Sequence, residues 1–241
     1  MVTLEIKILR RESRDAAPFW QSFFYTPQGD GETVATVLTW LCETPDLRDI
    51  DGNPAALIRW EHSCLQKKCG ACAMVINGTP RLACHARLSE YKDVISLEPL
   101  RKFPVAADLI VDRSAMLDQL RSMALWLRED QVPIMDRFED AYDSSRCLQC
   151  GLCLEVCPNF RVDGAFFGAS AAIPAGRLLS ESDNPRKTEL AKAYRQYVYE
   201  GCGRSLACHD VCPAGIDVER LMAKSNGAVL WRLFQRKKKG D

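Results

Sequence analysis

Of the twelve cysteines in this chain, all but Cys42 fall into three groups, and their spacing constrains the fold more than any other feature. The middle group runs from Cys147 to Pro158 with the spacing C-x2-C-x2-C-x3-C-P, which is the bacterial ferredoxin run. In such a run three thiolates hold one compact iron–sulfur cluster, and the fourth usually ligates a different cluster. The run therefore predicts that further cluster ligands lie elsewhere in the chain.

The first group predicts a 2Fe–2S site. Its pattern is the plant-type C-x4-C-x2-C…C, and its members are Cys64, Cys69, Cys72 and Cys84. The dipeptide Asn77-Gly78 favours a type I′ hairpin, which would bring Cys84 back to the loop that holds the other three. A zinc site is the alternative, and the four-residue first step in a β-rich context makes it the weaker one.

The third group has one cysteine too few for a complete ferredoxin run. It reads Cys202-x5-Cys208-x3-Cys212-Pro213, and Ser205 stands where the run would place its second cysteine. Two-cluster proteins exchange the last cysteine of each run. That exchange predicts a 4Fe–4S site with four thiolates, from Cys147, Cys150, Cys153 and Cys212. It leaves three thiolates for the second site, from Cys157, Cys202 and Cys208.

Three thiolates predict a 3Fe–4S cluster, because the iron without a protein ligand is lost. The alternative is that the Ser205 oxygen serves as a fourth ligand. Alkoxide is a harder ligand than thiolate and suits cluster iron less well, so we favour the three-iron cluster. Twelve cysteines without a secretory signal also argue against a disulfide scaffold and favour metal binding in a reducing compartment.

The predicted fold class is α+β, with two domains. Residues 1–104 are predicted to form a β-grasp 2Fe–2S ferredoxin-like domain, and residues 105–241 an α-helical domain that binds the 4Fe–4S and 3Fe–4S clusters. Alternating and helical periodicities predict strands over 3–8, 20–26, 73–76, 79–83 and 94–97, and helices over 33–41, 114–127, 188–200 and from 217 onward.

Charge and hydropathy exclude several classes of partner. Lys+Arg and Asp+Glu both number 32, so no net charge attracts nucleic acid. The longest uncharged runs, 16–29 and 164–176, are too short to span a bilayer, and the first residues lack the apolar core of a signal peptide. We expect a soluble subunit with no transmembrane segment of its own. A solvated acidic face is predicted from Glu129, Asp130, Asp136, Glu139 and Asp140.

With the cysteine groups in this order and Ser205 in place of a cysteine, the chain resembles the iron–sulfur subunit of succinate dehydrogenase and fumarate reductase, the succinate:quinone oxidoreductase family. The resemblance covers nearly the whole length. Its motifs include SCLQKKCGACAMVING (63–78), RLAC (81–84), LEPL (97–100) and DLIVDRS (108–114).

This resemblance implies partners and a path for electrons. The partners are an FAD-containing flavoprotein subunit, which interconverts succinate and fumarate, and a membrane anchor of the cytochrome b type, which handles quinone. Electrons would pass between FAD, 2Fe–2S, 4Fe–4S, 3Fe–4S and quinone in that order or its reverse. The chain would lie at the cytoplasmic face of the cell membrane, held by its partners, and would make or break no substrate bond itself.

The chain departs from the family at the acceptor end, where the resemblance places Pro158 and Ser205 near the acceptor. Well-studied members carry tryptophan just beyond the corresponding proline, where this chain has Asn159-Phe160-Arg161, and others carry histidine at the position of Gly203. The form Cys-Gly-x-Ser-x-x-Cys resembles menaquinone-linked bacterial members. Two alternatives stay open: the same three clusters serving another flavin-dependent reductase, acting on another enoate or a thiol pair, and a metal-binding module without redox function.

Overall fold

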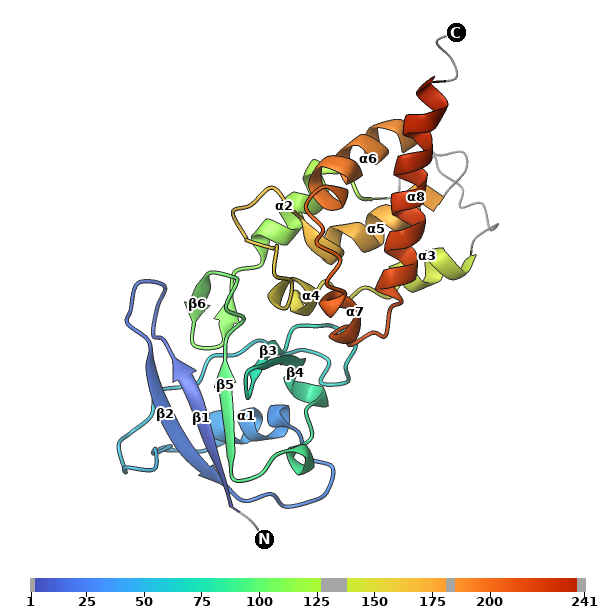
Figure 1. The fold of residues 1–241 in the computed structure, drawn as a ribbon. Helices are drawn as coiled ribbons and strands as arrows, with labels where there is room; N and C mark the ends of the chain where they lie inside the picture. Colours follow the sequence, from blue (N-terminus) through green and yellow to red (C-terminus); the bar gives the residue numbers. More distant parts are fainter. Residues whose placement is uncertain (1–2, 127–137, 181–184, 238–241) are drawn as a thin grey trace. The chain divides into compact units, whose positions relative to one another are not determined.

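The computed structural model describes residues 3–126, 138–180 and 185–237. The chain divides into two units, Met1–Arg113 and Ser114–Asp241 (Figure 1). The sequence predicts a boundary between 104 and 105, whereas residues 105–113 group with the first unit. The physical reason is a buried ion pair that joins this segment to the first strand, described below.

A five-stranded mixed sheet forms the centre of the first unit, in the order β2-β1-β5-β3-β4 (Figure 1). Strands β1 and β5 run parallel, and every other neighbouring pair is antiparallel. The strands are β1 (Leu4–Arg10), β2 (Phe19–Tyr25), β3 (Ala73–Ile76), β4 (Thr79–Leu82) and β5 (Val94–Glu98). This mixed sheet confirms the predicted strands and the α+β class.

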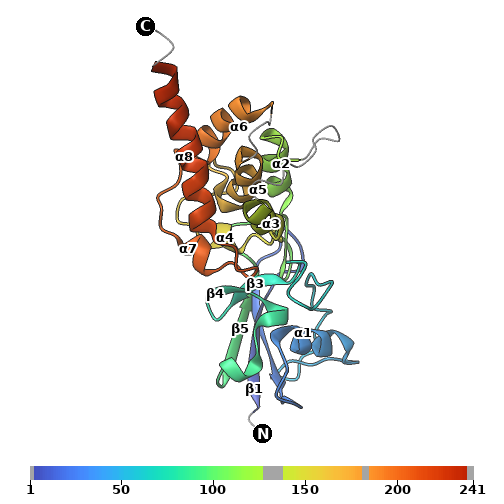
Figure 2. The same cartoon turned by 90° about the vertical axis from the view of Figure 1, so that its right-hand side faces the viewer.

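Helix α1 (Val34–Glu43) covers one face of the sheet (Figure 2). It begins at Thr33 with a capping box: the Thr33 hydroxyl accepts a hydrogen bond from the amide of Thr36, and the Thr36 hydroxyl accepts one from the amide of Thr33. Such a cap contributes about 1 kcal/mol. The helix buries Val34, Val37, Leu38 and Leu41, and β1 buries every second residue, including Leu4, Ile6 and Ile8.

The predicted hairpin is present between β3 and β4. Both residues of its turn have positive φ, 46° at Asn77 and 76° at Gly78, as a type I′ turn requires. The hairpin leads directly into a short 3₁₀ turn, η1 (Ala83–His85), which carries Cys84. A second 3₁₀ turn, η2 (Leu88–Glu90), precedes β5.

A small hairpin closes the first unit, from β6 (Val105–Ala107) and β7 (Ile110–Val111). Its turn residue Asp108 is buried, and its carboxylate pairs with the guanidinium of Arg10 at the end of β1, with Nε 3.0 Å from Oδ1. The same carboxylate accepts hydrogen bonds from the amides of Arg11 and Arg59. These bonds join the hairpin to the rest of the first unit.

The second unit is helical, and its described residues include no strand. Its elements are α2 (Ser114–Ser122), α3 (Phe138–Ser145), α4 (Leu152–Glu155), α5 (Gly168–Ser180), α6 (Lys187–Tyr194), the π turn η4 (Arg195–Tyr199), α7 (Ala207–Asp210) and α8 (Val218–Lys237). Among the described residues of the chain, no helix combines the length and the apolar character needed to cross a membrane.

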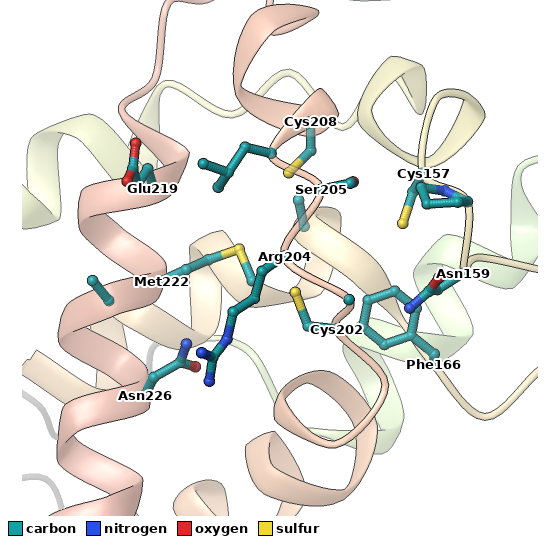
Figure 3. A pocket seen from close by; sticks show the side chains of 15 residues that line it. Cys157, Asn159, Phe166, Cys202, Arg204, Ser205, Cys208, Glu219, Met222 and Asn226 are labelled. Atoms are coloured by element: carbon teal, nitrogen blue, oxygen red, sulfur yellow. The ribbon is translucent and has the colours of Figure 1, made fainter.

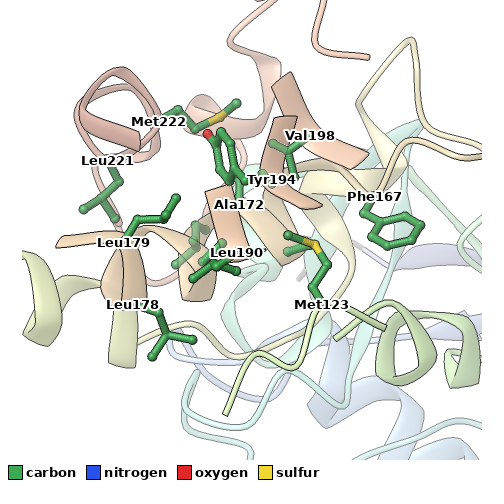
Figure 4. Close-up of a cluster of buried hydrophobic side chains, with 14 of the residues drawn as sticks. Met123, Phe167, Ala172, Leu178, Leu179, Leu190, Tyr194, Val198, Leu221 and Met222 are labelled. Carbon is green, nitrogen blue, oxygen red and sulfur yellow. The ribbon is translucent and has the colours of Figure 1, made fainter. Parts of the chain in front are cut away.

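Helix α5 is the centre of this unit and contacts α3, α6 and α8. Nearly all of its residues are buried, and its apolar side chains form one cluster with Leu190, Tyr194 and Leu221 from the surrounding helices (Figure 4). The Tyr194 hydroxyl lies 3.0 Å from Oδ1 of Asn226 and so joins α6 to α8. Burial raises the pKa of Tyr194 well above its usual range.

The predicted helices are confirmed in part. The helix expected over 188–200 is α6 followed by the π turn η4, and the helix expected from 217 is α8, whose first turn is capped by the Asp217 carboxylate. Helix α2 ends early, because Ala124 adopts φ 51°. Leu117, placed on its predicted apolar face, is 54% exposed, and residue 127 lies outside the described residues.

The predicted solvated acidic face is wrong at Asp140, which is buried. Its carboxylate accepts hydrogen bonds from Arg220 Nη1 at 2.6 Å and from Lys224 Nζ at 2.7 Å, so α3 is clamped to α8. Burial acts to raise the pKa of Asp140, but Lys224 and Arg220 outweigh it and lower the pKa. Residues 129, 130 and 136 of that stretch lie outside the described residues.

Candidate cluster-binding sites

The loop of the first cysteine group turns its backbone amides toward sulfur. The amides of Gln66 and Lys68 each donate to Cys64 Sγ at 3.3 Å, and the amide of Lys67 donates to Cys84 Sγ at 3.3 Å. Left-handed residues make this possible, because φ is 51° at Leu65 and 60° at Lys67, and such alternation makes successive N–H groups converge on an anion.

All four predicted 2Fe–2S ligands are brought together here. Hydrogen bonds from the amides of Gln66 and Lys68 lower the pKa of Cys64 to about 7, and Cys69 is its neighbour. Burial raises the pKa of Cys72 to about 12, and Cys84 and Cys69 lie beside it. Cys69 is exposed, Cys72 is buried, and Cys64 and Cys84 are intermediate, which fits a cluster held near a surface.

Two supports of this loop could not be read from the cysteine spacing. The guanidinium of Arg113 donates to the carbonyl of Ala71 at 3.2 Å and to Glu61 at 2.9 Å, so the last residue of the first unit holds both ends of the loop. Lys67 Nζ lies 2.6 Å from Nε2 of His85, the residue after Cys84. The motif DLIVDRS contains Arg113, but its spacing does not show what the side chain touches.

The middle and last cysteine groups repeat one local backbone. In each, the second and fourth residues after the first cysteine are left-handed, with φ 50° at Gln149, 85° at Gly151, 56° at Arg204 and 58° at Leu206. A short helix, α4 or α7, begins at the next residue. In this repeat Cys153 corresponds to Cys208, Cys157 to Cys212, and Cys150 to Ser205. The backbone therefore agrees with the alignment that places Ser205 at a cysteine position.

The predicted 4Fe–4S ligands line one small cavity of about 20 Å³. They are Cys147, Cys150 and Cys153 from the middle group and Cys212 from the last. Burial raises the pKa of Cys147 and, more strongly, that of Cys153, which has the other three ligands around it. Buried thiols of this kind ionise when a metal binds them.

The three remaining cysteines line a larger cavity of about 290 Å³. The sulfurs of Cys157, Cys202 and Cys208 point toward one space, and Ser205 lies between them (Figure 3). Pro158 and Ser205 are exposed, whereas the three cysteines are partly buried. The three thiols of this cavity are thus less exposed than Pro158 and Ser205, the two predicted acceptor-side residues in its lining.

Cys208 lines both cavities. Burial raises its pKa, and the cysteines that add most to this shift are Cys157 and Cys202. We therefore group Cys208 with those two.

The sulfur donors at these positions fit iron–sulfur clusters. Among the described residues, no three histidine, cysteine or acidic side chains converge on one point as ligands of a single metal ion do. The thiols of the second unit instead border cavities, from two segments each. A multi-iron cluster requires thiolates spread around it in this way.

Each of the two units matches a known protein family. The family described as a 2Fe-2S iron-sulfur cluster binding domain matches residues 5–118. The family described as a 4Fe-4S dicluster domain matches residues 143–216. The cluster types predicted for the first and middle cysteine groups are therefore those of the matched families.

Relatives match along nearly the whole chain. The succinate dehydrogenase iron-sulfur subunit of Bacillus subtilis is 32% identical, over 93% of this chain and 91% of that protein. The fumarate reductase iron-sulfur subunit of Mycobacterium tuberculosis is 35% identical, over 90% of this chain and 87% of that protein. An uncharacterized iron-sulfur protein of Methanocaldococcus jannaschii is 32% identical over 71% of this chain and 35% of its own length.

Solved structures share the fold. A chain of the Mycobacterium smegmatis Sdh1 complex superposes with a TM-score of 0.76 at 23% identity, over 97% of this chain and 98% of that one. A hypothetical protein from Helicobacter pylori superposes with a TM-score of 0.58 at 13% identity, over 94% of this chain and 39% of that one. The order of sheet unit and helical unit therefore recurs in chains of low sequence identity.

Proposed function

This chain belongs to the family of succinate dehydrogenase and fumarate reductase iron–sulfur subunits, and we propose that its three cysteine sets hold a 2Fe–2S, a 4Fe–4S and a 3Fe–4S cluster that conduct electrons between two partner subunits. Electron transfer is the function of the family. The observation that carries the proposal is the convergence of eleven cysteines into three separate sets, two of them interleaved between distant segments. The alternatives of another flavin-dependent reductase and of a redox-inactive module have no comparable support.

We assign the ligands as the sets described above. Cys64, Cys69, Cys72 and Cys84 hold the 2Fe–2S cluster. Cys147, Cys150, Cys153 and Cys212 hold the 4Fe–4S cluster. Cys157, Cys202 and Cys208 hold the 3Fe–4S cluster, with Ser205 beside it and not bound to it. Support comes from the cavities that the last two sets line and from the repeated backbone that puts Ser205 opposite Cys150.

The chain's own residues would hold the clusters, shield them from water and adjust their reduction potentials. When bound, the clusters accept and release single electrons. The amides of residues 66–68 donate to Cys64 and Cys84, and such hydrogen bonds stabilise negative charge on sulfur. The apolar cluster around α5 keeps water from the cysteines of the second unit that pack against it, among them Cys147, Cys153 and Cys212. Hydrogen bonds to sulfur and shielding from solvent are both factors that set the potential of a cluster.

The partners we assign are those that a subunit of this family requires. One is an FAD-containing flavoprotein that carries the succinate and fumarate chemistry. The other is a membrane anchor, of the cytochrome b type, that exchanges electrons with menaquinone. We propose that the chain lies at the cytoplasmic face of the cell membrane, with the exposed residues Pro158 and Ser205 toward the acceptor.

Iron content and EPR spectroscopy of the complex purified without oxygen test the proposal. Three clusters of these types contain about nine irons per chain. The three-iron cluster gives an EPR signal in the oxidised state, and the other two give signals when reduced. Iron near two per chain, no oxidised-state signal, or zinc in place of iron would contradict it. Succinate oxidation and fumarate reduction by the same complex then show whether the flavoprotein partner is the one proposed.

A further inference from the structure

The cavity assigned to the 4Fe–4S cluster contains one polar side chain that reaches a ligand. Apart from its cysteines, its lining is apolar except for Gln149 and Ser170. The Ser170 hydroxyl lies 3.3 Å from the carbonyl of Phe167, within its own helix turn. The side chain of Gln149 instead crosses the loop, and its Nε2 lies 3.3 Å from Sγ of Cys147.

The orientation of the Gln149 amide follows from its acceptors. Nε2 has a second partner, the carbonyl oxygen of Ser170 at 3.1 Å. A sulfur ligand and a carbonyl oxygen are both acceptors, so the nitrogen end, which carries two N–H donors, must face them. The other end, Oε1, is buried and has no hydrogen-bond partner among the described residues. Such a group is rare in native proteins and calls for a reason.

The backbone conformation at Gln149 and a buried anchor residue fix the position of this side chain. Gln149 adopts φ 50°, a conformation that non-glycine residues take up infrequently. Its anchor Ser170 is 2% exposed and lies in the central helix α5. A left-handed loop residue and a rigid helix therefore fix one N–H at the sulfur of Cys147.

We propose that Gln149 raises the reduction potential of the 4Fe–4S cluster by donating a side-chain hydrogen bond to its ligand Cys147. The inference rests on the ligand assignment of the proposed function and adds a tuning residue to it. The added electron places more negative charge on the cluster and its sulfurs, so an N–H donor stabilises the reduced form more than the oxidised form. Hydrogen bonds to sulfur are one of the factors that set cluster potentials.

The chain supplies a matched control. Cys64-Leu65-Gln66 in the first group repeats the tripeptide Cys147-Leu148-Gln149. There the bond to sulfur comes from the backbone amide of Gln66, at 3.3 Å, so truncating its side chain leaves the donor in place. Gln66→Leu is therefore the same chemical change without loss of a side-chain donor to sulfur.

Potentiometric EPR titration of the intact complex tests the inference. For Gln149→Leu we expect about a tenfold loss in the equilibrium constant for reduction of the 4Fe–4S cluster, which is 59 mV for one electron. Gln149→Glu, which replaces the donor with an acceptor of equal size, should lower the potential at least as much. The 2Fe–2S potential in the same samples should not move, and Gln66→Leu should leave the 4Fe–4S potential unchanged.

The inference would be overturned, and the proposed function left standing, if the 4Fe–4S potential were unchanged in Gln149→Leu. The same holds if the 4Fe–4S potential shifted equally in Gln66→Leu. A wild-type complex with no four-iron signal would overturn the proposed function first. If the variants lose the 4Fe–4S cluster, a measurement on the wild-type complex still tests the hydrogen bond. With ¹⁵N in glutamine side chains only, pulsed EPR of the reduced 4Fe–4S cluster should show a ¹⁵N coupling, and its absence would refute the hydrogen bond.

Discussion

The side-chain amide of Asn159 fills the space beside Gly203. Its Nδ2 donates to the carbonyl of Gly201 at 2.7 Å, and a Cβ on residue 203 would lie 2.9 Å from the same nitrogen. Gly203 and the stretch Asn159-Phe160-Arg161 are the two places at which the sequence departs from the pattern of the family that it resembles. They therefore form one packed contact, which joins the segment after Cys157 to the segment after Cys202 at the three-cysteine cavity.

Gly203→Ala should destabilise this contact. The added methyl displaces the Asn159 amide and breaks its hydrogen bond, a loss of about 1 kcal/mol. Thermal unfolding of the complex and the intensity of the oxidised EPR signal measure the effect. Gly31→Ala is the control, because no atom of the described residues lies within 4 Å of its added Cβ and Gly31 lies outside the helices. If Asn159→Ala does not lessen the effect of Gly203→Ala in the double variant, the contact is not its cause.

Asp108→Asn should destabilise the first unit far more than Asp112→Asn. The pair of Asp108 with Arg10 is buried, with side chains 2% and 4% exposed, and removing one charge of a buried pair costs about 3–5 kcal/mol. The pair of Asp112 with Arg14 is exposed and contributes about 1 kcal/mol or less. Urea unfolding followed by the visible absorption of the 2Fe–2S cluster measures both, and equal losses would contradict the structure.

The two extreme cysteines of the first group should differ in reactivity once iron is removed. A lowered pKa means more thiolate at a given pH, and the thiolate is the nucleophile. Cys64, with its pKa near 7, should reach half its maximal alkylation rate close to that pH. Cys72, with its pKa near 12, should react slowly up to pH 9. Mass spectrometry of the iron-free full chain after timed alkylation gives both rates, and faster labelling of Cys72 would refute the assignment of the amide donors.

Ser205→Cys should convert the three-iron site into a four-iron site. The repeated backbone places this residue at the position of Cys150, so the new thiolate completes a set of four. We expect about one more iron per chain and loss of the oxidised-state EPR signal. Ser205→Ala is the matched control and should keep three irons. Loss of iron from Ser205→Ala would instead show that the serine oxygen is a ligand.

The spacing of the cysteines and the alternation of β1 predicted most of the first unit, because both signals are local. Helix α5, by contrast, gave no helical periodicity. Its residues are buried on all sides, so polar positions do not alternate with apolar ones, and Pro174 lies within it. Asp140 was missed for a related reason, since its partners Arg220 and Lys224 lie far away in the sequence.

For the candidate sites, the sequence predicts only which cysteines form each set, and these ligand sets stay a prediction. Spacing identifies thiolates, but it does not show which donors face them. The amides of residues 66–68 depend on left-handed φ values at non-glycine residues, which no sequence rule anticipates. The Gln149 side chain depends on where α5 passes. Both are properties of the packed structure.

The exchange of final cysteines between the two runs has a consequence for biosynthesis. Each of the two cysteine-lined cavities of the second unit takes its cysteines from residues before 160 and from residues after 200. When only the middle cysteine group has emerged from the ribosome, its thiols therefore do not yet form a complete cluster site. Insertion of the three-iron cluster must wait for Cys208, and insertion of the four-iron cluster for Cys212, to be synthesised and folded back, whereas the set completed by Cys84 can be loaded while translation continues.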